Sequence, residues 1–404
     1  MKHILITGAN FKNKGAQSML FTLADAIRKM DSECRISFTS AESCDMSEYT
    51  FDHVFYSRRS RKIVLRKHPV FYMLEAACAD TAKCILRRKE VLWHAADLRK
   101  IMPTVDLMID VSGFALGDKW SVKIQERFLD SIRIAKKYQI PIIFMPQSFG
   151  PFDYEPDKSF LLQEIKELLP YADLIYAREK EGYQCLKEKF GLNNVRLSTD
   201  LVLQSEKIDT VNIYRTQPSV SVPRILPDSV GLVPNKKCFT YGSESDILDR
   251  YRLIIDELLL SGKYVCIFRH SAEDGEVCSR IYEPYADNPQ VRLLTEDFSC
   301  LEYDELVKQF QFMVCSRYHS IVHAYRNAVP CVILGWAVKY QELAQLMRQE
   351  QYVFNIADTK SDTEACRRMV QNMLQDYEGE SVIIKQRVSE VQKDNCFACL
   401  KNYL

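Results

Sequence analysis

The sequence has little glycine and proline, no long apolar run and no net charge, and each absence excludes a class of protein. Its 404 residues contain 13 Gly and 14 Pro, so long flexible linkers are not expected. No stretch approaches the roughly 18 apolar residues of a membrane span. Because 54 Lys and Arg balance 54 Asp and Glu, no overall field draws the chain to nucleic acid. The 47% of apolar residues is typical of a globular protein with two or three domains.

Paired cysteines are also lacking. The 14 cysteines are scattered singly from Cys34 to Cys399, which indicates reduced, buried thiols and not a disulfide framework. The one C-x-x-C pair, Cys396 and Cys399, has no second pair or histidine cluster near it, which argues against a zinc or redox role. No D-x-D motif lies at an expected strand end, so no metal is expected, and no cofactor is expected either. Residues 1–8 are too short an apolar run for a signal peptide. We therefore expect a cytoplasmic protein.

Short apolar runs alternate with helical patterns along most of the chain. Strands are expected at 2–7, 105–111, 141–145, 173–177, 229–233, 264–269, 291–294, 312–315 and 331–334. Helical patterns lie between them, and this alternation predicts an α/β fold with parallel sheets covered on both faces. Prolines between 205 and 228 mark a boundary, so we predict two doubly wound, Rossmann-like domains that face a cleft. The expected limits are 1–215, with a basic helical insertion at about 53–100, then 225–375, and a C-terminal helix at 376–404.

The strongest candidate site is the junction of residues 315–320, where an expected strand ends and a helix begins. It places Arg317 and His319 beside the free N–H groups of a helix N-terminus, which attracts phosphate or carboxylate. The alternative is that Ser316 caps the helix while the other two residues lie on the surface. His270 follows another expected strand and faces either the same cleft or solvent. Arg178, at a strand end in the first domain, reaches a shared anion or pairs with Glu179.

Loops in the first domain carry further candidates for the cleft. They lack the spacing of dinucleotide-binding and P-loop motifs, so a nicotinamide or nucleotide triphosphate site is not predicted there. Their small and polar residues fit either ligand contact or tight turns. The candidates are Asn13, Gly15, Asp110, Gly113 and Gln147.

Residues 53–100 contain twelve Lys or Arg against four acidic residues. Apolar residues interleave with these charges, a pattern that fits an amphipathic basic surface on an anionic membrane or around a diphosphate. The alternative is a solvated helical insertion whose apolar face packs on the rest of the protein.

Taken together, the motifs resemble the polysaccharide pyruvyl transferase family. The resemblance rests on Asn13-Lys-Gly15-Ala16, Asp110-Val-Ser-Gly113, Pro146-Gln147-Ser-Phe-Gly150-Pro151, Ala177-Arg178, Ser198-Thr-Asp200, Ser316-Arg317-Tyr318-His319 and Trp336-Ala-Val-Lys339-Tyr340. It implies a fold like that of the two-domain GT-B glycosyltransferases and transfer of the pyruvyl group of phosphoenolpyruvate to two sugar hydroxyls as a cyclic ketal. The chain departs from the family pattern at Glu179, where Asp is frequent, and at Tyr318, where Leu is common.

The implied donor sets requirements that these residues meet. Phosphoenolpyruvate carries a phosphate and a carboxylate, so we expect Arg178, Arg317 and Lys339 to bind it, with Tyr318 beside them. Ketal formation needs proton transfer, and His319 is the expected general acid or base. The resemblance further implies an acceptor sugar of a capsule or exopolysaccharide precursor, carried on a polyprenyl diphosphate at the inner face of the cytoplasmic membrane.

Two other readings compete with this one. A glycosyltransferase of the same architecture would use a nucleotide sugar, and Glu342 and Glu350 have the E-x7-E spacing found in some of those enzymes. A sugar-binding protein on a degraded version of the fold is the second alternative. The joint presence of Arg317, His319 and Lys339 argues against that alternative.

Overall fold

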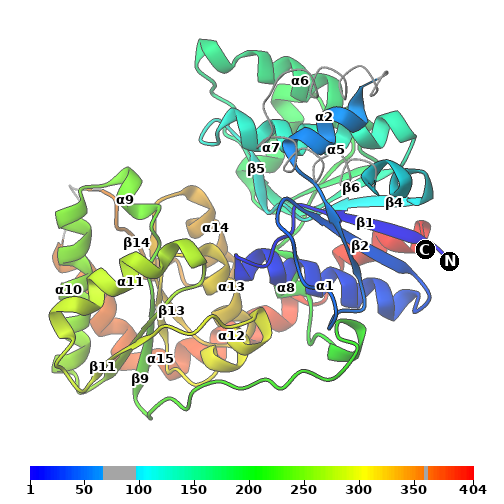
Figure 1. Ribbon diagram of the computed structural model, residues 1–404. Coiled ribbons are helices and arrows are strands. Elements are labelled where there is room, and N and C mark those ends of the chain that lie inside the picture. The colour runs from blue at the N-terminus through cyan, green and yellow to red at the C-terminus, as the bar shows by residue number, and fades with distance from the viewer. Residues whose placement is uncertain (67–96, 359–362) are drawn as a thin grey trace, which may run out of the picture.

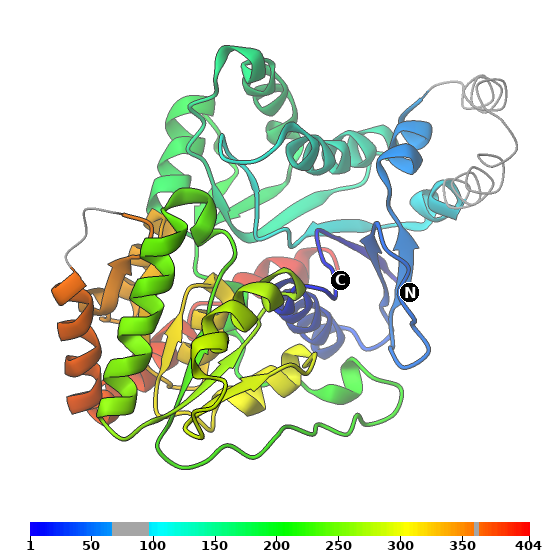
Figure 2. The same cartoon turned by 60° about the vertical axis from the view of Figure 1, so that its left-hand side comes forward.

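Two parallel sheets organise the protein, as the alternating pattern predicted. The computed structural model describes residues 1–66, 97–358 and 363–404. In these residues the sheets form two α/β domains that lie side by side (Figure 1, Figure 2).

The first sheet has a doubly wound strand order. Its strands, in spatial order, are β3 (Asp52–Phe55), β2 (Arg35–Ser40), β1 (His3–Thr7), β4 (Leu107–Asp110), β6 (Ile142–Phe149), β7 (Leu174–Ala177) and β8 (Val195–Leu197), and β5 (Phe114–Leu116) pairs with β6. Ile4 and Ile6 enter one core while Leu5 enters another, because successive side chains point to opposite faces. The winding direction reverses between β1 and β4, and ligands of such folds bind at the carboxyl ends of the strands there.

The second sheet follows the same scheme. Its spatial order is β11 (Val291–Leu294), β10 (Tyr264–Phe268), β9 (Ser229–Val233), β12 (Met313–Cys315), β13 (Cys331–Gly335) and β14 (Val353–Asn355). Every pairing in this sheet is parallel. Its winding reverses between β9 and β12, which gives the protein a second switch point.

Helices cover both faces of each sheet (Figure 1). They are α1 (Lys14–Met30), α2 (Arg58–Leu65), α5 (Val122–Tyr138), α6 (Phe160–Leu168), α7 (Lys180–Phe190), α8 (Leu201–Gln204), α9 (Cys238–Tyr241), α10 (Glu244–Leu260), α11 (Gly275–Tyr282), α12 (Cys300–Val307), α13 (Tyr318–Arg326), α14 (Val338–Leu346) and α15 (Thr363–Val391). Helix α1 packs against α12 and α13 of the second domain, so one apolar core continues across the boundary. This shared core fixes the two switch points relative to each other.

The last helix crosses back to the first domain. α15 is interrupted at Asp376, where the backbone leaves helical geometry (φ −141°, ψ 33°). The chain then ends in a 3-10 helix, Cys396–Asn402, whose first N–H donates to Gln204 Oε1 at 2.8 Å. Both termini therefore lie beside the first domain (Figure 1).

Three details differ from the sequence-based expectation. Strand β6 does not stop at residue 145 but continues through Pro146, because a register shift between Phe144 and Gln147 takes up the missing proline N–H. Strands β2, β3, β5, β8 and β14 were not predicted, and all of them except β2 are only three or four residues long. The segment expected to begin a helical insertion at about 53 therefore begins with the last residues of β3.

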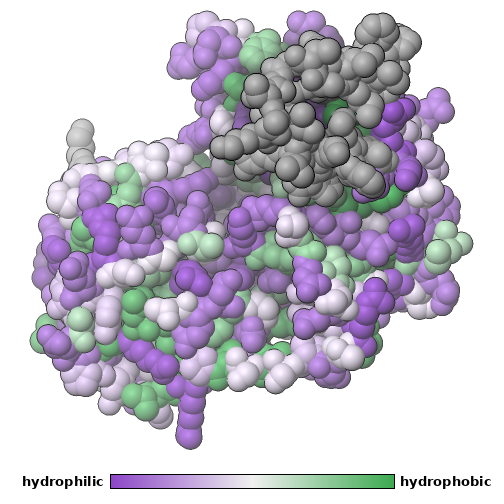
Figure 3. All heavy atoms as spheres, in the orientation of Figure 1, coloured by the Kyte–Doolittle hydropathy of each residue, from purple (hydrophilic) through white to green (hydrophobic). Residues whose placement is uncertain are grey.

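The basic segment is only partly a surface feature. Arg61 is buried, donates to Asp130 at 3.0 Å and lies over the Tyr56 ring, and Arg58 pairs with Glu126. Arg59 and Lys62 are exposed, and residues 67–96 lie outside the described residues. Hydrophilic side chains predominate on the face drawn in Figure 3. No helix in the described ranges has the length and apolar character required to cross a membrane.

Candidate active site

The candidate residues gather where the two domains meet at the carboxyl ends of their strands. His319 is the second residue of α13, directly after β12, and Asp200 follows β8 and caps α8 in the other domain. The imidazole Nε2 lies 3.4 Å from Asp200 Oδ2. The site therefore needs both domains.

The environment of this pair favours proton transfer. Burial lowers the pKa of His319, and the Asp200 carboxylate opposes that shift. Burial also disfavours the Asp200 carboxylate, but His319 and Arg178 outweigh this and hold its pKa at about 2. Asp200 thus stays ionised and can orient the imidazole and stabilise its protonated form. Because Nε2 faces the carboxylate, Nδ1 is the ring atom left to exchange a proton with a ligand.

Two predicted glycines make room for this histidine. A Cβ on Gly15 would lie 2.3 Å from His319 Cγ, far inside van der Waals contact. Gly113 has a φ of +71°, and a Cβ there would lie 3.0 Å from Met19 Cε and 3.8 Å from His319 Cε1. Both glycines, predicted as cleft residues, thus line the imidazole itself.

Arg178 is committed to neighbouring carboxylates. Its Nη1 donates to Asp200 at 2.7 Å and its Nε to Glu179 at 3.0 Å, while the guanidinium lies 4.0 Å from the centre of the Tyr318 ring. Its side chain is only 2% exposed. The predicted Arg–Glu pairing is therefore present, and it links the first domain to Tyr318 in the second.

Arg317 is also paired. Its Nε donates to Asp274 at 2.7 Å, and its Nη2 donates to Glu273 at 2.6 Å and to the second oxygen of Asp274. Asp274 is fully buried. The positive charge predicted to bind an anion is thus already balanced by two carboxylates.

Two lysines, Lys339 and Lys237, bring positive charges to the site that no carboxylate of the described residues pairs with. Lys339 Nζ lies 5.1 Å from the Phe114 ring and 5.4 Å from the Tyr318 ring, and Lys237 Nζ lies 3.7 Å from the Trp120 ring. Neither ammonium makes a hydrogen bond or ion pair with a residue of the described ranges. Burial and neighbouring cations lower the pKa of Lys339 to about 7 and that of Lys237 to about 8. Because neither lysine is paired with a described residue, each can bind an anionic ligand between the domains in its protonated form.

The other predicted cleft residues hold the site together. Asp110 is buried and accepts hydrogen bonds from Thr7, from Ser112 and, at 3.2 Å, from Gln147 Nε2. Asn13 caps α1 by accepting from the Gly15 N–H at 2.9 Å. These contacts order the loops around His319.

His270 lies behind the site. It is 1% exposed, its ring lies parallel to that of His319 at 6.5 Å between centroids, and neither of its nitrogens has a partner in the described part of the chain. Burial, together with His323 and His319, lowers its pKa well below the ordinary value. His270 therefore packs as a neutral ring against the candidate catalytic imidazole.

Sequence reasoning assigned no role to Asp200 and did not single out Lys237. Both follow strand ends, Asp200 after β8 and Lys237 after β9. A polar residue directly after a strand was the available signal. What the sequence did not show was the partner that each residue meets in the other domain.

The comparisons with solved structures define the class of fold. A UDP-GlcNAc 2-epimerase from Methanocaldococcus jannaschii is 12% identical with a TM-score of 0.56, covering 96% of this chain and 99% of that one. A spinosyn rhamnosyltransferase in complex with thymidine diphosphate is 11% identical with a TM-score of 0.54, covering 100% and 99%. A putative UDP-N-acetylglucosamine 2-epimerase from Listeria monocytogenes is 8% identical with a TM-score of 0.56, covering 95% and 90%. The protein thus has the two-domain GT-B architecture, as predicted.

The family follows from the sequence match. The model of the polysaccharide pyruvyl transferase family matches residues 13–337, so the chain belongs to this family and is a transferase. No curated protein matches the chain. The predicted family resemblance is confirmed.

Proposed function

We propose that the protein transfers the pyruvyl group of phosphoenolpyruvate to two hydroxyls of a sugar, forming a cyclic ketal and inorganic phosphate. The observation that carries this proposal is the His319–Asp200 pair together with Lys339, whose Nζ lies 5.4 Å from the ring of Tyr318, the residue before His319, and whose charge interacts with those of Lys237 and Arg178. A proton-transfer group next to concentrated positive charge suits a donor that carries both a phosphate and a carboxylate.

The donor is held by cations from the second domain and by a helix terminus. Helix α13 has no side-chain cap, so its first N–H groups, with Lys237 and Lys339, form an anion-binding surface. The rings of Phe114 and Trp120 support the two ammonium groups from the first domain. Arg317 contributes to donor binding by fixing the loop that precedes α13.

The chemistry needs one proton donor and a route for two hydroxyl protons. A sugar oxygen bonds to C2 of phosphoenolpyruvate while His319 gives a proton to the methylene carbon, which becomes a methyl group. The proton of the attacking sugar hydroxyl passes to the imidazole of His319 and restores its protonated form. A second sugar oxygen then bonds to C2, the C2–O bond to phosphate breaks, and the second hydroxyl proton leaves with the phosphate. Asp200 stabilises the imidazolium throughout.

The direct test measures phosphate release and product mass with phosphoenolpyruvate and a panel of lipid-linked glycans. The expected product gains the mass of a pyruvyl ketal, and release requires both substrates. His319→Gln should lower turnover by roughly 10²–10⁴-fold while donor affinity stays within a few-fold, because the imidazole moves protons and contributes little binding. Unchanged turnover in His319→Gln would contradict its role in proton transfer. In a parallel reaction with a nucleotide sugar in place of phosphoenolpyruvate, release of nucleotide would favour a glycosyltransferase.

Donor affinity should fall as the pH rises from 6.5 to 9. The lowered pKa values, about 7 for Lys339 and about 8 for Lys237, mean that both ammonium groups lose their charge in this range. Binding of the anion favours the charged forms, so complex formation takes up protons near pH 7.5. Calorimetry in buffers of different ionisation enthalpy measures that uptake. Lys339→Met should weaken binding about tenfold or more and reduce the uptake, whereas pH-independent affinity would contradict the lysine assignment.

One sequence motif, the E-x7-E spacing of Glu342 and Glu350, favours the alternative of a glycosyltransferase, and the structure shows where its two glutamates lie. Glu342 accepts hydrogen bonds from the backbone N–H groups of Lys180 and Glu181, at 2.7 and 3.3 Å, and so caps α7 of the other domain. Glu350 is exposed at the start of a 3-10 helix. The E-x7-E pair therefore gives that alternative no separate support.

The acceptor in this proposal is a capsule or exopolysaccharide precursor on a polyprenyl diphosphate, which the family resemblance implies. The protein would meet it at the inner face of the cytoplasmic membrane. Of the basic segment, the exposed Arg59 and Lys62 on α2 are available for contact with anionic lipid.

A further inference from the structure

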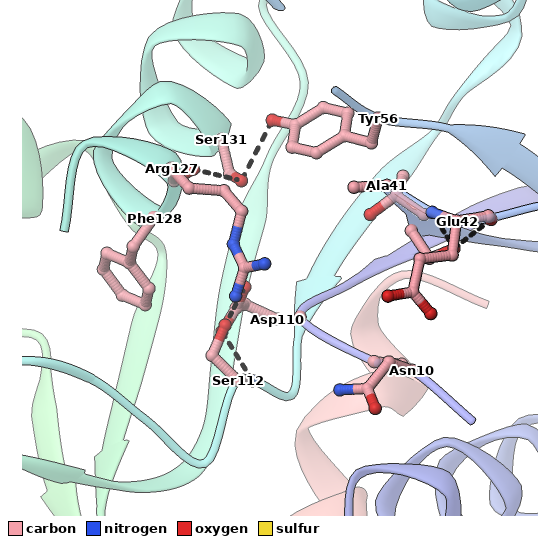
Figure 4. Close-up of a pocket in the computed structure, with 13 residues that line it drawn as sticks. Asn10, Ala41, Glu42, Tyr56, Asp110, Ser112, Arg127, Phe128 and Ser131 are labelled. Carbon is pink, nitrogen blue, oxygen red and sulfur yellow. Dashed lines mark hydrogen bonds between the residues drawn. The ribbon is translucent and has the colours of Figure 1, made fainter. Parts of the chain in front are cut away.

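A polar pocket opens near the candidate active site and is lined only by residues of the first domain (Figure 4). It has a volume of about 250 Å³ and lies at the carboxyl ends of β1, β2 and β4, with α5 as its wall. The Ser112–Gly113 turn separates it from His319, since Ser112 lines the pocket and Gly113 packs on the imidazole. The pocket thus lies across the Ser112–Gly113 turn from the proposed proton donor.

The pocket contains an arginine, Arg127, that forms no ion pair with a carboxylate of the described residues. Arg127 extends from α5 toward Ser112 (Figure 4), and its guanidinium makes no hydrogen bond or ion pair with a residue of the described chain. By contrast, Arg133 on the same helix pairs with Asp130 and Glu164, both at 2.8 Å. Asp110 lines the same pocket and its charge acts on Arg127, but it makes no ion pair with the guanidinium and already accepts hydrogen bonds from its own loop and from neighbouring strands. The N–H groups of Arg127 are therefore left for a ligand.

Other polar groups of the pocket complement this cation. The side-chain oxygen of Asn10 accepts from the Asn13 N–H at 2.9 Å, which leaves its amide N–H groups to donate. Glu42, on another side, is held by Lys12 at 2.7 Å and offers its second oxygen as an acceptor for a hydroxyl. Two donors and one acceptor around a small open cavity match a sugar that carries an anionic substituent.

We propose that this pocket is an acceptor subsite that binds an anionic group, a carboxylate or a phosphate, through Arg127 and Asn10. The proposal rests on the proposed pyruvyl transfer, because it takes the neighbouring His319 as the place of reaction. Two sources offer this chemistry: the carboxylate of a uronic acid residue and the diphosphate of a lipid carrier. An unpaired guanidinium binds either through two parallel hydrogen bonds.

Binding measurements with defined probes test the subsite independently of turnover. Methyl glucuronide, neutral methyl glucoside and inorganic pyrophosphate are titrated into the full-length protein by calorimetry and ligand-observed NMR. The variants are Arg127→Gln and the matched control Lys123→Gln, which removes a charge from an exposed position on the same helix outside the pocket. Lys339→Met serves as the complementary variant of the donor side.

An anionic probe should bind more tightly than the glucoside and lose about tenfold or more in affinity in Arg127→Gln, but not in Lys123→Gln. Loss of glucuronide binding identifies a carboxylate as the ligand, and loss of pyrophosphate binding identifies the carrier diphosphate. Lys339→Met should weaken phosphoenolpyruvate and spare that probe. If phosphoenolpyruvate fails to bind while the Arg127-dependent probe binds, the donor assignment fails and the anion subsite stands. Absence of binding by both anionic probes, or equal affinities in the wild type and Arg127→Gln, would overturn the proposal.

Discussion

Asp200→Asn should lower the turnover of pyruvyl transfer by roughly 10²–10⁴-fold. The carboxylate lies 3.4 Å from His319 Nε2 and is the charge that stabilises the imidazolium. Asparagine has nearly the same shape and still caps α8, where Asp200 accepts from the Val202 N–H at 3.0 Å. The substitution also weakens the buried pair of Asp200 with Arg178, at 2.7 Å, so urea unfolding is measured alongside turnover to separate a loss of stability from the loss of charge at His319.

The pH profile distinguishes this positioning role from a structural one. The Asp200 carboxylate raises the pKa of His319 against burial, so its removal lowers that pKa further. If His319 gives a proton to the donor, the rate falls as pH rises through this pKa, and the fall moves to lower pH in Asp200→Asn. Asp200→Glu keeps the charge and should retain more of the activity at pH 7. If kcat/KM falls at the same pH in both variants, the pairing of His319 with Asp200 is contradicted.

The architecture could be predicted because it depends on local patterns. Short, mostly apolar runs such as 229–233 are typical of strands buried on both faces, and strands at that spacing with helices between them imply parallel pairing. Edge strands such as β3 carry a weaker signal, because half of their surface faces solvent. The kink at Asp376 and the return of the chain to the first domain depend on contacts between distant segments, which periodicity does not encode.

The sequence predicted which strand ends carry residues of the site, but not which of these residues contact one another. The junction at 315–320 located His319, since a strand-to-helix turn has a recognisable composition. The partners of Arg178 and Arg317 were not accessible, because Asp200 and Asp274 are separated from them by 22 and 43 residues. Only the fold showed that these arginines are neutralised and that Lys237 and Lys339 are the available cations. A sequence does not distinguish a charged side chain without an ion-pair partner from one that a carboxylate neutralises.

This difference has its clearest consequence at Arg317, where Arg317→Ala should destabilise the protein by about 3–5 kcal/mol. The substitution leaves Asp274, fully buried and within hydrogen-bond reach of the guanidinium, without its counter-charge. Urea unfolding measures the loss. Arg280→Ala is the matched control in the same domain, because its pair with Glu244 is exposed and should contribute at most about 1 kcal/mol.

A double variant separates the structural role of Arg317 from a direct role in binding. Arg317→Met combined with Asp274→Asn removes both charges, so it should recover much of the stability lost in Arg317→Ala. Donor affinity in the double variant should then lie within a few-fold of the wild type, since Lys237 and Lys339 remain in place. If Arg317→Ala instead leaves stability unchanged and reduces donor affinity tenfold or more, the guanidinium leaves its carboxylates to bind phosphoenolpyruvate. The two results differ in both observables, because a buried ion pair contributes to folding whether or not substrate is present, whereas a ligand contact acts only in the complex.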